Sequence, residues 1–273
     1  MRTACKFTLI IALITFALSE SPLKADNSGA AKYRQIKYTT RAYEEAVEWQ
    51  KDTRARLGKL LKIDDLLQNK TDLSFDAKEV SSSDKGFFTI KEIEINSTKN
   101  RRIRILVTTP NFLQGPFPAV VGIGGHSSTR YTVYEPETIR REFNSGDKLY
   151  KGFGTALAST GYVTITTQVS RHKVYEQGRT LMGERLWDLM RCVDYLESMP
   201  SVDAGRIGCG GLSLGGEMSM WLAAMDERLR ASVSCGFLTV MDQLEQGHCM
   251  CWKFDGLRAV SYTHLTLPTT PYV

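Results

Sequence analysis

The sequence predicts an α/β fold in which a mostly parallel sheet carries helices on both faces. From about residue 118 onward, short apolar runs alternate with longer runs whose apolar residues recur at helical spacing. This alternation is typical of βαβ units with right-handed crossovers. The chain has 273 residues, which is enough for one such domain with a large core.

The opening strands are expected to form an antiparallel hairpin. Residues 87–95 and 103–108 alternate apolar and polar side chains on either side of a polar link, as half-buried strands do. After Pro118, the apolar run at 119–123 predicts a buried parallel strand.

Helices and strands then alternate to the end of the predicted domain. The pattern predicts, in order, a short helix at 152–160, a strand at 161–167, an amphipathic helix at 181–199, a strand that ends near 212, a helix with apolar residues at 218, 221, 222 and 225, and a last strand at 231–237.

Both ends of the chain differ from this pattern. An apolar core at 7–18 follows Arg2 and Lys6, as in an export signal, although an uncleaved anchor is the alternative. Residues 41–67 indicate a helix or helix pair. We therefore divide the chain into an export signal at 1–25, an N-terminal helical extension at 26–84, an α/β domain at 85–259 and a tail at 260–273.

The tail at 260–273 resembles a translated sequencing adapter, and we expect native sequence to stop near Ala259. A genuine tail rich in Thr and Pro is the alternative. On the first interpretation the domain is incomplete at its C-terminus.

Composition argues against several classes of partner. There are 35 basic and 30 acidic residues, for a net charge of +5, and no basic run is interleaved with aromatic residues, so nucleic acid is not expected. The apolar core at 7–18 is too short for a comfortable membrane span. We therefore expect a secreted or periplasmic protein without stable membrane insertion. Cys192, Cys209 and Cys235 fall in predicted helix or strand runs and are expected to be buried.

One motif indicates chemistry. Gly211, Leu212, Ser213, Leu214 and Gly215 form the pattern Gly-x-Ser-x-Gly between a predicted strand and a predicted helix. This context is that of a nucleophile elbow, in which a strained turn exposes the serine hydroxyl. Ser213 is thus the candidate nucleophile, and the Leu214 amide is a candidate oxyanion donor. An ordinary Gly-rich turn is the alternative.

These residues, with the preceding Val202-Asp-Ala-Gly-Arg-Ile-Gly208, resemble the α/β-hydrolase superfamily over residues 85–259. The similarity is greatest to the group of dienelactone hydrolases, acetyl xylan esterases and prolyl-oligopeptidase-like enzymes. The resemblance implies an α/β-hydrolase fold. It also implies that the loop with Gly125, His126 and Ser127 supplies the second oxyanion amide, with His126 able to touch substrate. A plain Gly-rich turn is again the alternative.

Two further residues follow the strand predicted at 161–167. Arg171 and His172 lie beyond its carboxyl end, where open α/β sheets bind ligands. They are candidate substrate-binding residues, or they are simply solvated.

The resemblance also implies that a catalytic acid and a catalytic histidine follow Ser213, and these two residues are the ones that the sequence matches least well. Asp242, Glu245 and Asp255 lie early for the acid, and His248 is the one histidine between Ser213 and the tail. A serine needs an adjacent base. We therefore expect the full-length parent to be active and the present chain to be nearly inactive.

Three functions fit the sequence. The first is a serine hydrolase that cleaves carboxylic esters, including acetyl esters of carbohydrates. The second is an exported serine peptidase of the prolyl-oligopeptidase type, and the third is a non-catalytic binding module on the same fold. The expected partner is a small-molecule or carbohydrate ester. We expect no cofactor and no metal, because no second ligand cluster completes a site around His248, Cys249 and Cys251.

Overall fold

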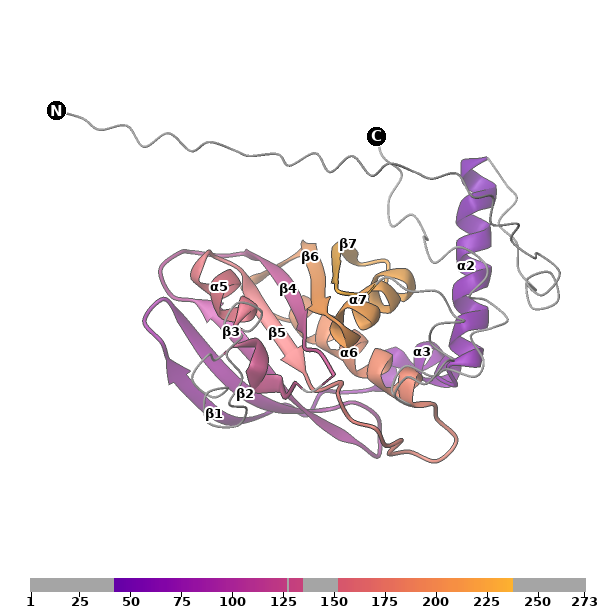
Figure 1. The fold of residues 1–273 in the computed structure, drawn as a ribbon, viewed down its shortest axis with the longest axis horizontal. Helices are drawn as coiled ribbons and strands as arrows, with labels where there is room; N and C mark the ends of the chain where they lie inside the picture. Colours follow the sequence, from indigo (N-terminus) through magenta and orange to yellow (C-terminus); the bar gives the residue numbers. More distant parts are fainter. Residues whose placement is uncertain (1–41, 127, 135–151, 238–273) are drawn as a thin grey trace, which may run out of the picture.

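The computed structural model describes residues 42–126, 128–134 and 152–237. These residues form one sheet with the strand order β1-β2-β3-β5-β4-β6-β7 (Figure 1). The strands are β1 (Lys78–Asp84), β2 (Phe88–Asn96), β3 (Arg102–Pro110), β4 (Phe117–Ile123), β5 (Val163–Thr167), β6 (Val202–Leu212) and β7 (Leu229–Cys235). The helices are α2 (Tyr43–Leu60), α3 (Asp64–Gln68), α5 (Phe153–Ser159), α6 (Leu181–Glu197) and α7 (Leu214–Met225), with short 3₁₀ turns η1 (Lys70–Asp72) and η2 (Arg130–Val133).

The sheet changes from antiparallel to parallel along its width. β1, β2, β3 and β5 pair antiparallel with one another in that order, whereas β4 is parallel to both β5 and β6, and β6 is parallel to β7. The predicted hairpin is confirmed as β2 and β3. The chain passes from β4 to β5 on one side and then to β6 on the other side of β4. The carboxyl ends of β4 and β6 therefore border a topological switch point, where such sheets bind ligands.

Helices cover both faces of the sheet, as the sequence predicts. The larger apolar cluster joins α6 and α7 to one face and includes Leu57, Leu61 and Ile63 from the N-terminal helices. The smaller cluster lies under α5 and η2 on the other face, with Leu106, Val133 and Ala158 among its members. The segment before the sheet thus contributes to the main core, while its assignment as a separate extension stays a prediction.

Helix α6 differs from the one-sided amphipathic helix that its sequence predicts. Most of its apolar residues are buried, but so are charged ones, and 13 of its 17 residues are buried in total. They include the charged residues Glu184, Arg185, Asp188 and Arg191. The amphipathic interpretation is wrong in this respect, because ion pairs and hydrogen bonds, several of them to Arg101 and Arg171 in other segments, offset the cost of burying these side chains.

Strand β1 has no counterpart in the sequence analysis. All seven of its residues are exposed, so the apolar alternation that reveals other strands is missing. It is held by its backbone pairing with β2. Cys192 and Cys209 are buried, as expected, but Cys235 is exposed. The expectation for Cys235 is wrong because β7 is exposed beyond its first residue.

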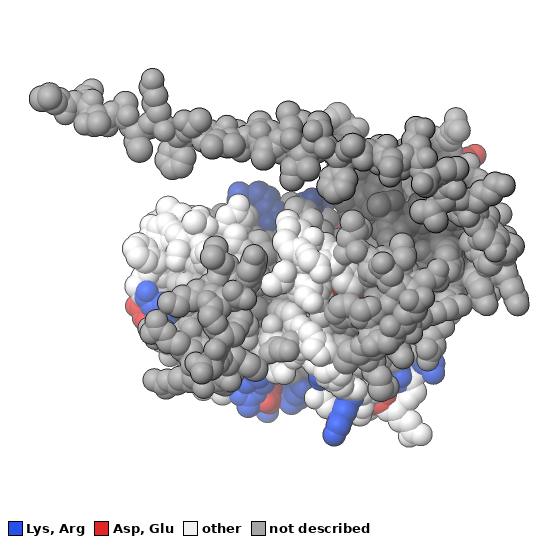
Figure 2. Space-filling view, viewed as in Figure 1, with Lys and Arg blue, Asp and Glu red and all other residues white. Residues whose placement is uncertain are grey.

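Charged side chains on the face in view lie at its margins, and along the lower margin Lys and Arg are interspersed with Asp and Glu (Figure 2). Ion pairs across the β2–β3 hairpin have this mixed character, since Arg102 and Arg104 both bind Glu94 at 2.8 and 2.7 Å. In the part of the chain that the structure describes, no helix is long and apolar enough for a membrane span.

Substitution of Gly183 tests how closely the N-terminal helices pack on α6. A Cβ atom at this position would lie 2.1 Å from the Leu61 carbonyl oxygen and 2.8 Å from Thr180 Oγ1. We predict that Gly183→Ala lowers the free energy of unfolding by about 2 kcal/mol or more, because backbone must move to admit the methyl group. Urea denaturation measures this change.

The control is Gly210→Ala in β6, where the new Cβ would be in ordinary contact at 3.5 Å from Val233. Equal stability of the two variants would contradict the close docking of Leu61 on α6.

Candidate active site

Ser213 occupies the turn between β6 and α7. Its backbone angles are φ 57° and ψ −120°, a region that costs a residue with a side chain about 1–3 kcal/mol. Its side chain is partly exposed, at the head of α7. The structure therefore places this serine in the strained strand–turn–helix that the motif predicts.

The flanking glycines make this turn sterically possible. A Cβ atom at Gly211 would lie 2.4 Å from the Gly215 carbonyl oxygen, and one at Gly215 would lie 2.1 Å from the Ile123 carbonyl oxygen. Real Cβ atoms essentially never come so close to backbone. Only glycine at these positions lets the ends of β4 and β6 meet the start of α7.

Backbone hydrogen bonds fix Ser213 on both sides. Its N–H donates to the Cys235 carbonyl oxygen at the end of β7 (2.8 Å), and its carbonyl oxygen accepts from the Glu217 N–H (3.0 Å). Leu214, whose side chain is fully buried, is the first residue of α7. Its N–H is one of those at a helix start that have no acceptor within the helix.

The loop after β4 lies against this turn. A Cβ atom at Gly125 would lie 3.1 Å from the Leu212 carbonyl oxygen and 3.7 Å from Ser213 Cβ. The loop is tied to the segment after β5, since Ser170 Oγ donates to the Ser128 carbonyl oxygen at 2.6 Å. Ser127 lies outside the described residues.

Two of the sequence candidates from different loops meet. The rings of His126 and His172 pack edge to face, with centroids 4.8 Å apart and an interplanar angle of 85°. His126 follows the glycine that abuts Ser213, so the loop that carries it borders the nucleophile. His172 is exposed and His126 is partly exposed.

Arg171 is engaged by the protein itself. Its guanidinium donates to Asp188 Oδ2 at 2.8 Å and to Glu184 Oε2 at 3.2 Å, and it lies 4.8 Å above the Tyr175 ring. These contacts pair the charge of Arg171 within the protein and anchor the loop that carries this residue. Its direct contact with substrate stays a prediction.

Asp188 is the centre of a buried ionic network. Besides Arg171, it accepts hydrogen bonds from Arg101 Nη2 at 2.7 Å and Ser97 Oγ at 2.5 Å, both from the link between β2 and β3. Burial of Arg101 disfavours its charge, yet the facing Asp188 carboxylate outweighs this and raises the pKa of Arg101 above its usual value.

Glu184, one turn earlier on α6, holds the same loop by its backbone. Its carboxylate accepts from the N–H groups of Tyr175 and Glu176 at 2.8 to 3.1 Å. Helix α6 thus fixes the loop that carries His172 and the link between β2 and β3 through two buried carboxylates.

Glu217 is a residue that the sequence analysis missed. It lies one turn after Ser213 on α7 and is buried, and its Oε2 atom has no hydrogen-bond partner in the described structure. Burial raises the pKa of Glu217 to about 8, despite the nearby Arg185 and a hydrogen bond from Trp221. The signal in the sequence is a single acid inside an apolar helix.

The remaining candidates lie outside the described residues. They are the possible acids Asp242, Glu245 and Asp255, the possible base His248, and Cys249 and Cys251. The residues that the structure does describe contain no group of three His, Cys, Asp or Glu side chains arranged to hold a metal ion.

Comparison with solved structures adds to this geometry. A protein from Bacteroides fragilis NCTC 9343, assigned as an acetyl xylan esterase, matches 76% of this chain and 59% of its own chain with a TM-score of 0.55 and 15% identity. The two chains share this fold. The present chain has the α/β-hydrolase fold. A family model described as the prolyl oligopeptidase family matches residues 156–245, which span the strand, turn and helix around Ser213.

Two curated proteins share parts of the sequence of this chain. YtaP of Bacillus subtilis, named as a hydrolase, is 28% identical over 45% of this chain and 44% of its own length. The 4-O-methyl-glucuronoyl methylesterase of Hypocrea jecorina is 23% identical over 58% of this chain and 31% of its own length. The chain therefore spans less than half the length of the curated relatives that it matches.

Asp188 gives a direct test of the buried network. We predict that Asp188→Asn lowers the free energy of unfolding by about 3–5 kcal/mol, because Arg101 and Arg171 are left buried without their shared counter-ion. The matched control is Asp203→Asn, which breaks an exposed pair with Arg206 at 2.6 Å and should cost about 1 kcal/mol or less. Chemical denaturation of both variants checks this, and equal losses would show that the network contributes no more than a surface pair.

The raised pKa of Glu217 predicts that the stability of the folded protein depends on pH. Between the ordinary value of 4.5 and about 8, the folded protein keeps a proton that the unfolded chain has released. This carboxyl therefore makes stability fall as the pH rises through that window. The variant Glu217→Gln lacks this loss, so its stability relative to wild type should rise between pH 5 and pH 8. Denaturation curves at several pH values measure the difference, and parallel curves would refute the raised pKa.

Proposed function

We propose that this protein is a serine hydrolase that cleaves carboxylic esters, with Ser213 as the nucleophile. The observation that carries the proposal is the strained backbone of Ser213 at the head of α7, next to Gly125. Such strain is retained where surrounding structure and function demand it. A turn with only a structural role could carry glycine at this position, since glycine adopts a positive φ at no steric cost.

In the proposed reaction, Ser213 Oγ attacks the ester carbonyl carbon and gives its proton to a base. The carbonyl oxygen becomes an oxyanion, which the Leu214 N–H and an N–H of the 125–127 loop would stabilise. The alcohol leaves with a proton, and water then releases the acid from the acyl-enzyme. The base and its acid are expected after residue 237, among the residues that follow β7.

The substrate class proposed here is an ester of a carbohydrate, acetyl esters in particular. The names of the Hypocrea jecorina relative and of the Bacteroides fragilis structure support it. His126 and His172 would line the entrance to Ser213 and contact the sugar. Arg171 would affect substrate binding indirectly, by anchoring the loop that positions His172. We also propose a secreted or periplasmic location, where polysaccharides are found, on the resemblance of residues 1–25 to an export signal.

A second candidate is a serine peptidase, which the match to the prolyl oligopeptidase family model supports. Comparison of acetylated xylan with a prolyl peptide as substrates separates the two. Release of acetate with no peptide cleavage supports the esterase, and the reverse result supports the peptidase.

The nucleophile is tested by Ser213→Ala in the protein translated from the complete gene. We expect the variant to lose labelling by a fluorophosphonate and to lose turnover of p-nitrophenyl acetate by a factor on the order of 10⁶. Alanine keeps the same backbone strain, so stability should change little. The control is Ser83→Ala on the exposed strand β1. Unchanged labelling of Ser213→Ala would exclude this serine as the nucleophile.

A further inference from the structure

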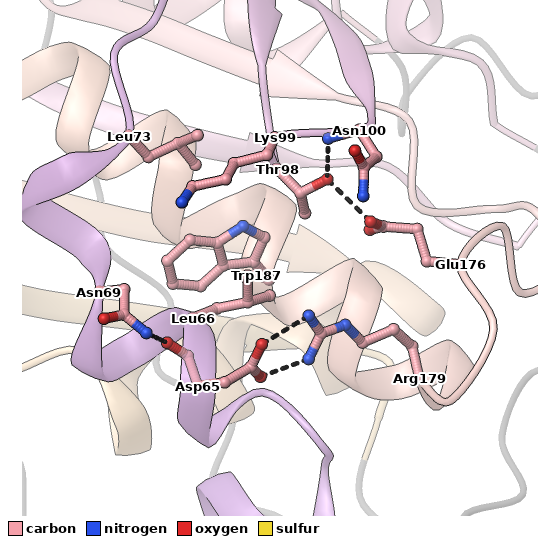
Figure 3. Close-up of a pocket in the computed structure, with 10 residues that line it drawn as sticks. All are labelled: Asp65, Leu66, Asn69, Leu73, Thr98, Lys99, Asn100, Glu176, Arg179 and Trp187. Carbon is pink, nitrogen blue, oxygen red and sulfur yellow. Dashed lines mark hydrogen bonds and ion pairs between the residues drawn. The ribbon is translucent and has the colours of Figure 1, made fainter.

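A cavity lies beside the link between β2 and β3, and we call it the hairpin cavity. Its volume is about 330 Å³, within the range of small-ligand sites. It is lined by α3 with the nearby Asn69 and Leu73, by the link at 98–100, by the loop before α6, and by Trp187 of α6. Figure 3 shows Lys99 and Asn100 on one side, the pair of Asp65 and Arg179 on the other, and Leu66 and Trp187 between them (Figure 3).

The walls of the hairpin cavity are held in place by polar contacts. Arg179 forms a two-pronged ion pair with Asp65 and donates to the Lys62 carbonyl oxygen at 2.7 Å. On the opposite side Thr98 Oγ1 donates to Glu176 at 2.9 Å. Trp187 is fully buried behind the cavity floor. The cavity is therefore preformed, which lowers the entropic cost of binding.

The charges around the hairpin cavity leave one cation uncompensated. Asp65 and Arg179 neutralise each other, and the charge of Glu176 is met by Arg101 at 3.2 Å. Lys99 is exposed, its side chain extends along the cavity in Figure 3, and within the described residues it has no ion-pair partner. The cavity thus offers an ammonium group, the Asn100 amide, and the apolar side chains of Leu66 and Leu73, while the Asn69 amide nitrogen already donates to the Asp65 carbonyl oxygen at 2.7 Å.

The hairpin cavity lies along the same edge of the sheet as Ser213. β3 begins at Arg102 and runs antiparallel to β5, with Ile105 opposite Thr167, so the link at 97–101 projects at the carboxyl end of β5. Strands β5 and β4 separate β3 from β6, which places the cavity about 14 Å or more from the Ser213 strand at three strand spacings. A polymer bound at Ser213 could reach it.

We propose that the hairpin cavity binds an acidic sugar unit of a polysaccharide whose ester lies at Ser213. The inference rests on the proposed function. The Asn100 amide and an apolar floor suit the hydroxyls and C–H faces of a sugar ring. The Lys99 ammonium suits a carboxylate, with which it forms a charge-assisted hydrogen bond. The sugar bound here is separate from the one that carries the ester.

The test compares two xylo-oligosaccharides of equal length, one with a glucuronic acid branch and one without, by titration calorimetry. Wild type should bind the acidic oligosaccharide about fivefold more tightly than the neutral one, the size expected for one exposed charge pair. This preference should shrink in high salt. In Lys99→Gln, which removes the charge and keeps a polar side chain, the preference should disappear.

The control is Lys78→Gln, an exposed lysine outside the cavity, which should keep the wild-type preference. A preference that survives in Lys99→Gln, or no binding of either oligosaccharide, overturns the inference. Turnover of p-nitrophenyl acetate is scored separately in the wild-type protein translated from the complete gene, since the present chain is expected to be nearly inactive. Its absence would refute the proposed esterase, whatever the calorimetry shows for the cavity.

Discussion

The close approach of three backbone segments around Ser213 is the constraint on which the candidate site depends. The end of β4, the end of β6 and the start of α7 meet at distances that admit no side chain, because a Cβ atom at Gly211 or Gly215 would lie within 2.4 Å of a carbonyl oxygen. The chain can make this junction only by forcing Ser213 into a positive φ. The strain of about 1–3 kcal/mol is small beside the packing of the sheet and helices that enforce it.

A second constraint is ionic and acts at a distance from Ser213. Asp188 and Glu184 on α6 hold the link between β2 and β3 and the loop after β5 to the same helix. Neither segment packs many apolar side chains at this edge, so their positions depend on these buried carboxylates. Buried pairs of this kind add little net stability over apolar packing, but they strongly penalise any arrangement that separates the charges. The network therefore selects one conformation of the loop that brings His172 to His126.

The elements that the sequence revealed are those with a regular apolar pattern. The hairpin of β2 and β3, the buried strand β4 and the Ser213 turn follow from residues close together in the chain. Strand β1 gave no such signal, because its side chains are exposed on both faces. The roles of Arg101, Asp188 and Glu184 were out of reach for another reason. Their partners lie up to 91 residues away, and no local pattern records which buried charges will meet.

The distinction between local sequence patterns and contacts of distant residues also bears on the choice of substrate. The Ser213 turn is built from local sequence and short backbone contacts, so it suits ester and peptide cleavage equally well and cannot decide between them. Substrates must therefore be distinguished by side chains from segments that tertiary contacts bring together at the carboxyl edge of the sheet. His126 and His172 come from two loops, and Lys99 comes from the link between β2 and β3. Specificity in this fold is therefore expected to depend on the ionic contacts of α6, which position two of these three segments, rather than on the motif around the nucleophile.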